Sequence, residues 1–590
     1  MKGLFFMRPL FVAVCLMSLV LGAMACSGGD SDGASPAAPV VPTKQPVAGK
    51  MGNITSPATP APAAAAPAKV DKAKASGPKT ERVILALQKP PAFSNDLAAF
   101  GSTSAFQLKP MYEYMIDTDP NTRNLIPGLA KSWQVEPSGS ALRFFLNKDV
   151  PFNGGQGGTM TADDVLWAWE DQTREDSIMS FRSLFRRAKL EVVNDYELTL
   201  TWPQPDADAL DGIANQVGGM EVSSRADAKT LGREGLIKRP IAGTGPYEFV
   251  SREQESNIIY RKADTPHWRV TPDFQEIEIR WISENSTRMA ALLAGEVHIT
   301  NIGFDQEQQA IAAGMEVVSG KVNTMRTYMQ MKGVYIKDSK DFTKGFKFPD
   351  NPLSEHKVRK ALNKAINRDA INTAYFYDMA TVMKMTHVAE THGAWNPRWG
   401  QQFDDQYGYD PAAARALLKQ AGYDYNNPLE TNLFVYEVAQ YTGGPDVALT
   451  IGAMWADIGV KVNFTEWDAA KRRAVGRKLE MNNMIGLGVL IAPPILALRL
   501  NHHTSPPRGG SVENLAVEPI FQKARESLDL KQQNEYLSAA ADIIYDEHLS
   551  IPLFWVPVHV MVNPEVVDDW IFPGTVSGTY THMWNIIGVR

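Results

Sequence analysis

The residues that could carry chemistry in this sequence are few, and their spacing does not favour catalysis. The only two cysteines, Cys15 and Cys26, lie near the N-terminus, so the rest of the chain has no thiol nucleophile, internal disulfide or cysteine-ligated metal site. No HExxH, GxSxG or P-loop GKS/T motif occurs. The sequence therefore predicts a protein that is not an enzyme and that carries no cofactor.

The ten histidines are scattered along the chain, except for the neighbours His502 and His503. Adjacent residues of a regular element point in different directions, which makes this pair a poor clamp for a metal ion unless the local backbone is irregular. We predict no metal site. His502 and His503 remain the one place where a metal or haem contact is left open.

The N-terminal segment is typical of an exported lipoprotein. Lys2 and Arg8 provide positive charge before the apolar stretch 11–20, and small residues then lead to Cys26. This order resembles a bacterial lipobox and predicts a lipoprotein signal peptide at 1–25 with lipidation of Cys26. Ordinary cleavage that leaves a free thiol is the competing interpretation.

Residues 26–80 are expected to form a lipidated cysteine followed by a disordered tether. The segment is rich in Pro and Ala and has almost no large apolar side chains, so it cannot offset its ordering entropy. A lipid at one end and a folded body at the other predict a protein anchored to a membrane outside the cytoplasm, in the periplasm or on the outer face of the cell membrane.

Composition limits the class of the body that follows. The chain has 590 residues with 44% hydrophobic and 21% charged residues, which predicts two or three lobes with sizeable cores. The formal net charge is −7, which argues against a nucleic-acid partner. No second apolar run is long enough to span a membrane. A secreted hydrolase is the enzyme class that stays open.

Local patterns predict a mixture of strands and helices. Alternating apolar residues predict strands at 277–282, 197–202 and 460–464. Apolar residues at helical spacing predict a helix over 358–366, and Asp410-Pro411 predicts the start of another, with Asp as N-cap. Since the sequence contains no catalytic motif, a binding site has to be sought on the loops and faces that these strands and helices position.

Seven segments occur in a characteristic order along the chain. They are NLIPGLAKSW (124–133), FFLNKDVPFN with MTADDV (144–165), GTGPY (243–247), NSTRMAALLAGE (285–296), VRKALNKAINRD (358–369), YDP (409–411) and WADIGVKV (455–462). Together they resemble the family 5 extracellular solute-binding proteins, the peptide/nickel type that serves ABC importers. The resemblance covers nearly all of 81–590.

The resemblance implies an α/β fold: a two-lobed clamp like the periplasmic binding proteins (class II type), with an extra subdomain inserted in the first lobe. The implied first lobe combines 81–111, 236–318 and 553–590, the inserted subdomain is 112–235, and the second lobe is 319–552. A small-molecule solute would be enclosed between the lobes by hinge closure and passed to the permease subunits of an importer. The resemblance also implies a monomer.

Dipeptide binders of this family carry two charged ligand contacts, and this sequence departs from both. Their aspartate for the peptide ammonium would fall within 489–496, which contains no charge. Their arginine for the peptide carboxylate would fall within 436–444, which contains no Lys or Arg. A buried unpaired charge costs about 3–5 kcal/mol. We therefore expect a less charged, partly apolar solute rather than a small free peptide.

The resemblance places candidate ligand contacts in three loops. From the first lobe they are Phe100, Ser102, Thr103 and Ser104; from the second they are Tyr436, Glu437, Gln440, Tyr441, Val489, Leu490 and Ile491. Two plainer interpretations stay open, namely that 489–496 is a buried core segment and that 100–104 is a solvated loop. A nickel, haem or oligopeptide binder of the same family stays open as well, as does a solute sensor without an importer.

Overall fold

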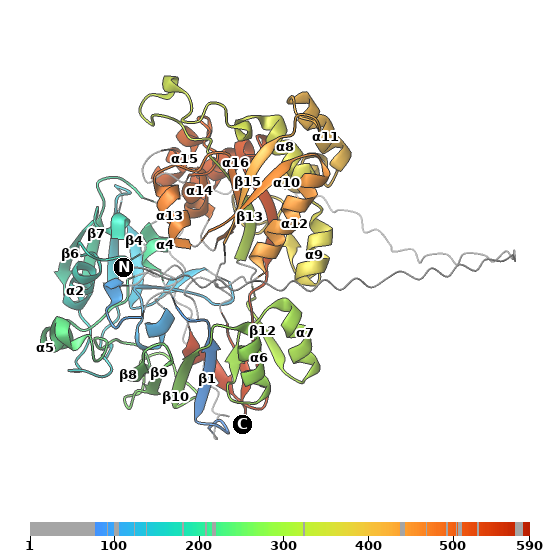
Figure 1. Ribbon diagram of the computed structural model, residues 1–590. Helices are drawn as coiled ribbons and strands as arrows, with labels where there is room; N and C mark the ends of the chain where they lie inside the picture. Colours follow the sequence, from blue (N-terminus) through green and yellow to red (C-terminus); the bar gives the residue numbers. More distant parts are fainter. Residues whose placement is uncertain are drawn as a thin grey trace, which may run out of the picture. The chain divides into compact units, whose positions relative to one another are not determined.

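Three sheets of four or more strands organise the part of the chain that the computed structural model describes (Figure 1). All described residues belong to one unit that extends to Arg590. The structure describes residues 77–90, 93–99, 106–122, 124–136, 138–179, 182–206, 209–214, 220–321, 325–436, 443–467, 469–490, 494–502, 504, 510–527, 530–572 and 582–590.

The first sheet has seven strands, and its order does not follow the sequence. In spatial order they are β12 (Glu316–Ser319), β19 (His559–Val562), β11 (Ile299–Thr300), β1 (Arg82–Leu87), β10 (Glu276–Trp281), β9 (Asn257–Lys262) and β8 (Tyr247–Glu253). Strand β1 is parallel to both β10 and β11, whereas β19 is antiparallel to β11 and β12. The chain leaves this sheet after β12 and returns only at β19.

The second sheet has six strands that all lie between these two points of the chain. In spatial order they are β14 (Thr381–Val382), β18 (Ile551–Val556), β13 (Met325–Lys332), β17 (Met484–Leu490), β15 (Glu430–Val435) and β16 (Lys461–Glu466). Central strand β13 is antiparallel to β17 and β18, and β15 is parallel to β16 and β17. β13 is therefore enclosed by neighbours on both edges.

A four-stranded antiparallel sheet and two short ribbons complete the strands of the described structure. The sheet is β4 (Ala130–Val135), β5 (Ala141–Leu146), β7 (Glu197–Thr201) and β6 (Lys189–Asn194). The ribbons pair β2 (Ile116–Thr118) with β3 (Leu125–Pro127) and β20 (Val567–Trp570) with β21 (Ile586–Gly588).

Helices surround each sheet, and Figure 1 shows α6 and α7 beside the first sheet and the later helices around the second. Those beside the first and four-stranded sheets are α2 (Ala162–Gln172), α3 (Arg182–Phe185), α4 (Ala209–Ile213), α5 (Arg225–Gly235), α6 (Asn285–Leu293) and α7 (Phe304–Ala312). Those around the second are α8 (His356–Lys364), α9 (Arg368–Phe376), α10 (Pro397–Tyr407), α11 (Pro411–Gln420), α12 (Gly444–Asp457), α13 (Ala469–Arg477), α14 (Pro494–His502), α15 (Val517–Glu526) and α16 (Leu530–Asp546).

The local predictions are confirmed because each rested on a short-range cause. The predicted strands correspond to β10, β7 and β16, and the predicted helix to α8, whose Val358, Ala361 and Leu362 are fully buried. At the start of α11 the Asp410 carboxylate accepts a hydrogen bond from the Ala413 amide at 2.8 Å, as an N-cap should.

Helix α14 connects two hydrophobic cores. Its Leu496 and Ala497 belong to the core of the four-stranded sheet, while Ile495 and Leu498 belong to the core of the second sheet. Residues on opposite sides of one helix can pack against two different cores. Both cores therefore fix the position of α14, and with it the side chains that α14 directs toward the second sheet.

Candidate functional site

Strand β13 separates two chemically different faces of the second sheet. Met325, Met329 and Met331 point into the large hydrophobic core. Because side chains alternate along a strand, every second residue from position 326 points to the opposite face. These residues are Arg326, Tyr328, Gln330 and Lys332. A polar row on a fully enclosed central strand is the first sign of a site.

Two glycines of β17 make room for this polar row. Gly486 lies opposite Gln330 and Gly488 opposite Tyr328 in the antiparallel register. A Cβ atom at Gly488 would lie 2.8 Å from Tyr328 Cζ, and one at Gly486 would lie 2.2 Å from the Phe434 ring. Both distances are shorter than van der Waals contact allows. The absence of side chains at these two positions of β17 thus shapes this face.

An aromatic stack continues the face beyond β15. The rings of Tyr436 and Phe434 lie 6.0 Å apart at 17°, and those of Phe434 and Trp467 lie 5.4 Å apart at 23°. The Arg472 guanidinium of α13 lies 4.7 Å from the Tyr436 ring centroid, which is cation–π geometry. The stack offers a flat apolar wall with one cation beside it.

Helix α14 supplies a hydrogen-bond partner for the polar row. The Tyr328 hydroxyl donates to Asn501 Oδ1 at 3.1 Å, and Gln330 Nε2 donates to the same oxygen at 2.9 Å. Burial raises the pKa of Tyr328 to about 12, so its proton is retained at neutral pH. Gln330 Oε1 is buried without a hydrogen-bond partner among the described residues.

Lys332 is the most unusual group of this face. Its side chain is only 6% exposed, and its ammonium donates to Ser511 Oγ at 3.2 Å. Burial, together with the positive charge of Arg472, lowers the pKa of Lys332 to about 7. Within the described part of the chain, no carboxylate lies within ion-pair distance of Lys332. Arg472 Nε is also buried and lacks a hydrogen-bond partner there.

Two buried histidines border the same region. His502 Nδ1 lies 3.3 Å from the Val512 carbonyl, and burial lowers the pKa of His502 to about 4. His387 packs edge-on against Tyr328 with ring centroids 4.5 Å apart and has a φ of 73°, which is strained for a residue other than glycine. Burial holds the pKa of His387 well below its usual value.

We call this group the second-sheet face. Its members are Tyr328, Gln330, Lys332, Phe434, Tyr436, Trp467, Arg472, Asn501 and His502. It combines an aromatic wall, two cations and several unused hydrogen-bonding atoms, and none of its members is a carboxylate. Such a surface can hold a partly apolar molecule and orient it with a few polar contacts.

The sequence-predicted ligand residues fall in different places. Tyr436 belongs to the second-sheet face, whereas Val489 is half-buried and packs against the core on the other side of the sheet. Leu490 ends β17, and His502 is buried at the end of α14. The other candidates, like Cys26, lie outside the described residues; they are Phe100, Ser102, Thr103, Ser104, Glu437, Gln440, Tyr441, Ile491 and His503.

Sequence reasoning missed Lys332 and Arg472. For Lys332 a signal existed, because the segment 325–332 alternates apolar and polar residues and ends on a lysine, a pattern typical of a strand with one apolar and one polar face. For Arg472 no signal existed, since it is one of several basic residues on α13 and only the fold shows which of them meets Tyr436.

A second buried charged group lies outside the second sheet, and we call it the paired cluster. Glu113 accepts hydrogen bonds from Arg269 Nε at 2.6 Å and from Trp268 Nε1 at 2.9 Å. Asp117 accepts from Arg269 Nη2 at 2.9 Å and lies 3.2 Å from His582 Nε2. Although burial alone would raise them, these partners hold the pKa of both carboxyl groups below the usual range.

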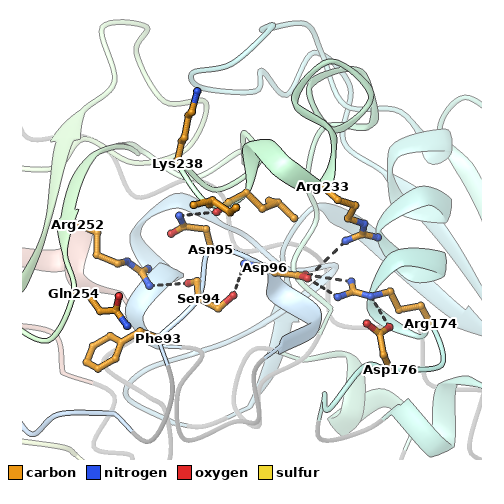
Figure 2. Close-up of a pocket in the computed structure, with 12 residues that line it drawn as sticks. Phe93, Ser94, Asn95, Asp96, Arg174, Asp176, Arg233, Lys238, Arg252 and Gln254 are labelled. Atoms are coloured by element: carbon orange, nitrogen blue, oxygen red, sulfur yellow. Dashed lines mark hydrogen bonds and ion pairs between the residues drawn. The ribbon is translucent and has the colours of Figure 1, made fainter.

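The pocket in Figure 2 is a cavity of about 700 Å³ between the segment 93–96, α5 and β8. Arg174 and Arg233 point at Asp96 from two sides, and Arg174 Nε also donates to Asp176 at 2.7 Å. Arg252 donates to the Ser94 carbonyl at 2.8 Å. Asp96 and Asp176 compensate Arg174 and Arg233, whereas Arg252 and Lys238 have no carboxylate partner among the described residues. The cavity lacks the aromatic stack of the second-sheet face, so it is a weaker candidate for a partly apolar molecule.

Neither a metal cluster nor a membrane-crossing helix occurs in the described structure. No group of three or more His, Cys, Asp or Glu side chains there is arranged to hold a metal ion. No helix among these residues has the length and apolar character needed to cross a bilayer.

Comparison with known sequences places the chain among binding proteins. The model of the middle region of the bacterial extracellular solute-binding proteins, family 5, matches residues 124–501. The dipeptide-binding protein of Escherichia coli K12 is 25% identical over 503 residues, covering 81% of this chain and 89% of that protein. Heme-binding protein A of Haemophilus influenzae is 27% identical over 409 residues, covering 65% and 70%.

Solved structures share the fold. The periplasmic binding protein DppA of Helicobacter pylori with the peptide STSA has a TM-score of 0.67 at 20% identity, covering 86% of this chain and 98% of that one. NikZ of Campylobacter jejuni with Ni(L-His) has a TM-score of 0.66 at 18% identity, covering 86% and 99%. The predicted two-lobed α/β fold is confirmed. The relatives are binding proteins, in agreement with the prediction that the chain is not an enzyme.

Proposed function

Because this chain belongs to the bacterial extracellular solute-binding proteins of family 5, the binding components of ABC importers, we propose that it delivers a less charged, partly apolar solute to a membrane permease. One observation carries the choice of solute. Among the residues that the structure describes, the second-sheet face contains the stack of Tyr436, Phe434 and Trp467 and no carboxylate that could pair with a peptide ammonium.

The charges of a zwitterionic peptide would not both be compensated on this face. A zwitterionic peptide would bring an ammonium group to a face whose charged members, Lys332 and Arg472, are both cationic. Like charges in a poorly solvated place repel, and an unpaired ammonium there costs several kcal/mol, about 3–5 on the scale of broken buried pairs. The aromatic wall instead favours apolar surface, at about 25 cal/mol per Å² removed from water.

We further propose the mode of capture and the arrangement of the lobes. The solute binds between a first lobe built on the seven-stranded sheet and a second lobe built on the six-stranded sheet, and binding favours a closed state that the permease recognises. The lobe and subdomain boundaries given from the sequence form part of this proposal. The protein is proposed to act as a monomer, which light scattering after size exclusion would test.

The anchor is a separate proposal. Cys26 carries a lipid and 27–80 serves as the tether to the membrane, outside the cytoplasm. Cys26→Ser should release the protein into the soluble fraction of cells that express it and abolish incorporation of a labelled fatty acid. Unchanged fractionation together with no labelling of the wild-type chain would contradict the anchor.

The test of the solute is direct extraction. Protein purified from its native host is denatured, and the released small molecules are identified by mass spectrometry. A thermal-shift panel of peptides, sugars, Ni²⁺, haem and amphiphilic acids and amides follows on the emptied protein, where a solute at roughly 100 times its Kd adds about 2.7 kcal/mol to stability. Partly apolar compounds should raise the melting temperature while dipeptides do not. A dipeptide hit would reject this choice of solute.

A further inference from the structure

Lys332 and Arg472 have no ionic partner among the described residues, although both have nitrogen atoms in the interior. Lys332 is 6% exposed, and the hydrogen bond of its ammonium goes to the neutral Ser511 hydroxyl at 3.2 Å. Arg472 Nε is buried and unpaired, and the guanidinium rests on the Tyr436 ring. Buried cations in proteins normally have a carboxylate partner, because the uncompensated charge is costly.

The remainder of the chain shows that it can compensate buried charge. Arg269 contacts two carboxylates, and the half-exposed Arg239 donates to both oxygens of the fully buried Asp227 at 2.7 and 2.8 Å. Other buried arginines, such as Arg288 and Arg368, donate to backbone carbonyls instead of carboxylates. Lys332 and Arg472 differ from these, because the Lys332 ammonium donates to a hydroxyl and Arg472 Nε has no hydrogen-bond partner among the described residues. Their place on the face that carries the aromatic stack is consistent with a counter-ion supplied by the solute.

We propose that Lys332 and Arg472 form an anion subsite of the second-sheet face, and that the captured solute carries one anionic group, such as a carboxylate, on an apolar or aromatic body. The inference rests on the proposed capture function and narrows its solute class. The Tyr436 stack receives the body, the two cations receive the anion, and the unpaired Gln330 Oε1 accepts from a donor of the solute.

The subsite fits one negative charge and no positive charge. Two cations with no carboxylate of the described residues within ion-pair distance give a positive local potential, which attracts an anion and repels an ammonium. The charge of Lys332 is also adjustable, because its pKa lies at about 7 in the empty protein. Binding of an anion stabilises the protonated form, so affinity decreases as the pH rises above about 7, by up to about tenfold per pH unit.

The neighbouring titratable groups do not supply the missing counter-ion. His502 and Arg472 are the charged or titratable groups that act on the Lys332 region from α14 and α13, and Tyr436 acts on Arg472 from the end of β15. Tyr328 faces the same space from β13 and keeps its proton. These four groups are neutral or cationic at neutral pH. The buried carboxylate of Glu513, two residues after Ser511, accepts a hydrogen bond from the Ile336 amide at 2.7 Å and forms no ion pair with Lys332.

The test uses matched acids and amides on the purified, emptied full chain. The probes are 3-phenylpropionate, indole-3-acetate and hexanoate, each compared with its own neutral amide in thermal melts at pH 6 and pH 9. The acids should raise the melting temperature at pH 6, clearly less at pH 9, and the amides should have little effect at either pH. Equal shifts with acids and amides, or no shift with any acid, would overturn the subsite.

Variants separate a binding role from a structural one. Lys332→Met should fold, melt at or above the wild-type temperature when empty, and weaken acid binding at least about tenfold, the effect of losing one charged contact. Arg472→Gln should weaken acid binding similarly. Lys461→Met, on the edge strand β16 of the same sheet and paired with Glu430, should bind as wild type.

The outcomes distinguish the two proposals. If Lys332→Met binds the acids as tightly as wild type, the subsite is wrong while solute capture stands. If the amides alone stabilise the protein, capture again stands and the anionic group is wrong. If extraction and the broad panel yield no solute at all, and Lys332→Met melts below wild type when empty, both proposals are wrong.

Discussion

The paired cluster and the second-sheet face bury similar groups in opposite ways. In the paired cluster, Glu113 and Asp117 share Arg269, and each carboxylate also has at least one further hydrogen-bond donor. On the second-sheet face, Lys332 and Arg472 have no carboxylate partner in the described structure. Burial of charge alone therefore does not mark a site. The second-sheet face differs because it joins cations without a carboxylate partner to an aromatic stack.

Removing the central cation of the paired cluster should have the largest effect. Arg269→Met would leave Glu113 and Asp117 buried without their shared counter-ion, which should cost about 3–5 kcal/mol in the free energy of unfolding. Urea unfolding followed by tryptophan fluorescence measures this. Arg143→Met, which breaks exposed pairs on the four-stranded sheet, is the control and should leave the midpoint nearly unchanged. Equal urea midpoints for Arg269→Met and Arg143→Met would contradict the compensating role of Arg269.

The corresponding change on the second-sheet face should have the opposite sign. Lys332→Met should stabilise the empty protein by about 2–4 kcal/mol at pH 6, because a buried ammonium with a depressed pKa is costly wherever it is charged. The folded pKa is about 7 and the usual value 10.5, so the wild type gains stability as the pH rises between them. The advantage of the variant should shrink across that window. A destabilised variant at pH 6 would mean that Lys332 is structural.

Filling the space beside β17 should disturb the second-sheet face without touching a charge. Gly486→Ala would place a Cβ 2.2 Å from the Phe434 ring and should cost about 1–3 kcal/mol through overpacking. Gly476→Ala on α13 meets only the flexible end of Met481 at 3.3 Å and lies within a helix, so stability should stay the same or rise by up to about 1 kcal/mol. Chemical denaturation of both variants decides between these expectations.

His502 of the second-sheet face should contribute to acid sensitivity at mild pH, together with other histidines whose pKa burial lowers, such as His387 and His548, whereas the paired cluster should contribute only at lower pH. Folding lowers the pKa of His502 from 6.5 to about 4, so the unfolded chain binds more protons than the folded chain between these values. The stability of the folded protein therefore decreases as the pH decreases through this range. His502→Gln should flatten this part of the profile by up to about 1.4 kcal/mol per pH unit.

Asp117→Asn is the matched comparison for this prediction. The pKa of Asp117 is held below its usual 3.8, so its stabilisation is present above that value and is lost only as the pH falls below it. The Asn variant should be less stable throughout but keep the wild-type slope between about pH 4 and 6.5, the window set by His502. Melting temperatures across a pH series measure both. A His502→Gln slope equal to that of the wild type would contradict the assignment.

More of the fold than of the site can be predicted from the sequence. Short-range causes, such as the Asp410 cap and the apolar face of α8, predict the elements, and the order of seven motifs predicts the architecture. The second-sheet face depends instead on long-range neighbours. Tyr436 could be predicted as a ligand contact from the position of its loop in the sequence. Arg472 could not, because it contacts Tyr436 only through the packing of α13. The glycines at 486 and 488 are visible in the sequence, but the side chains that require them lie on β13 and β15.

The position of β19 has a consequence for how the protein is made. This strand lies between β12 and β11 in the first sheet, yet it is synthesised after the whole of 325–556. The region around the second sheet can complete its own strand pairing while the ribosome still holds the C-terminal residues, whereas the first sheet has a gap until His559–Val562 emerges. Strand pairing over such a distance is slow. Closure of the first sheet should therefore be a late and slow step in the folding of the newly made chain.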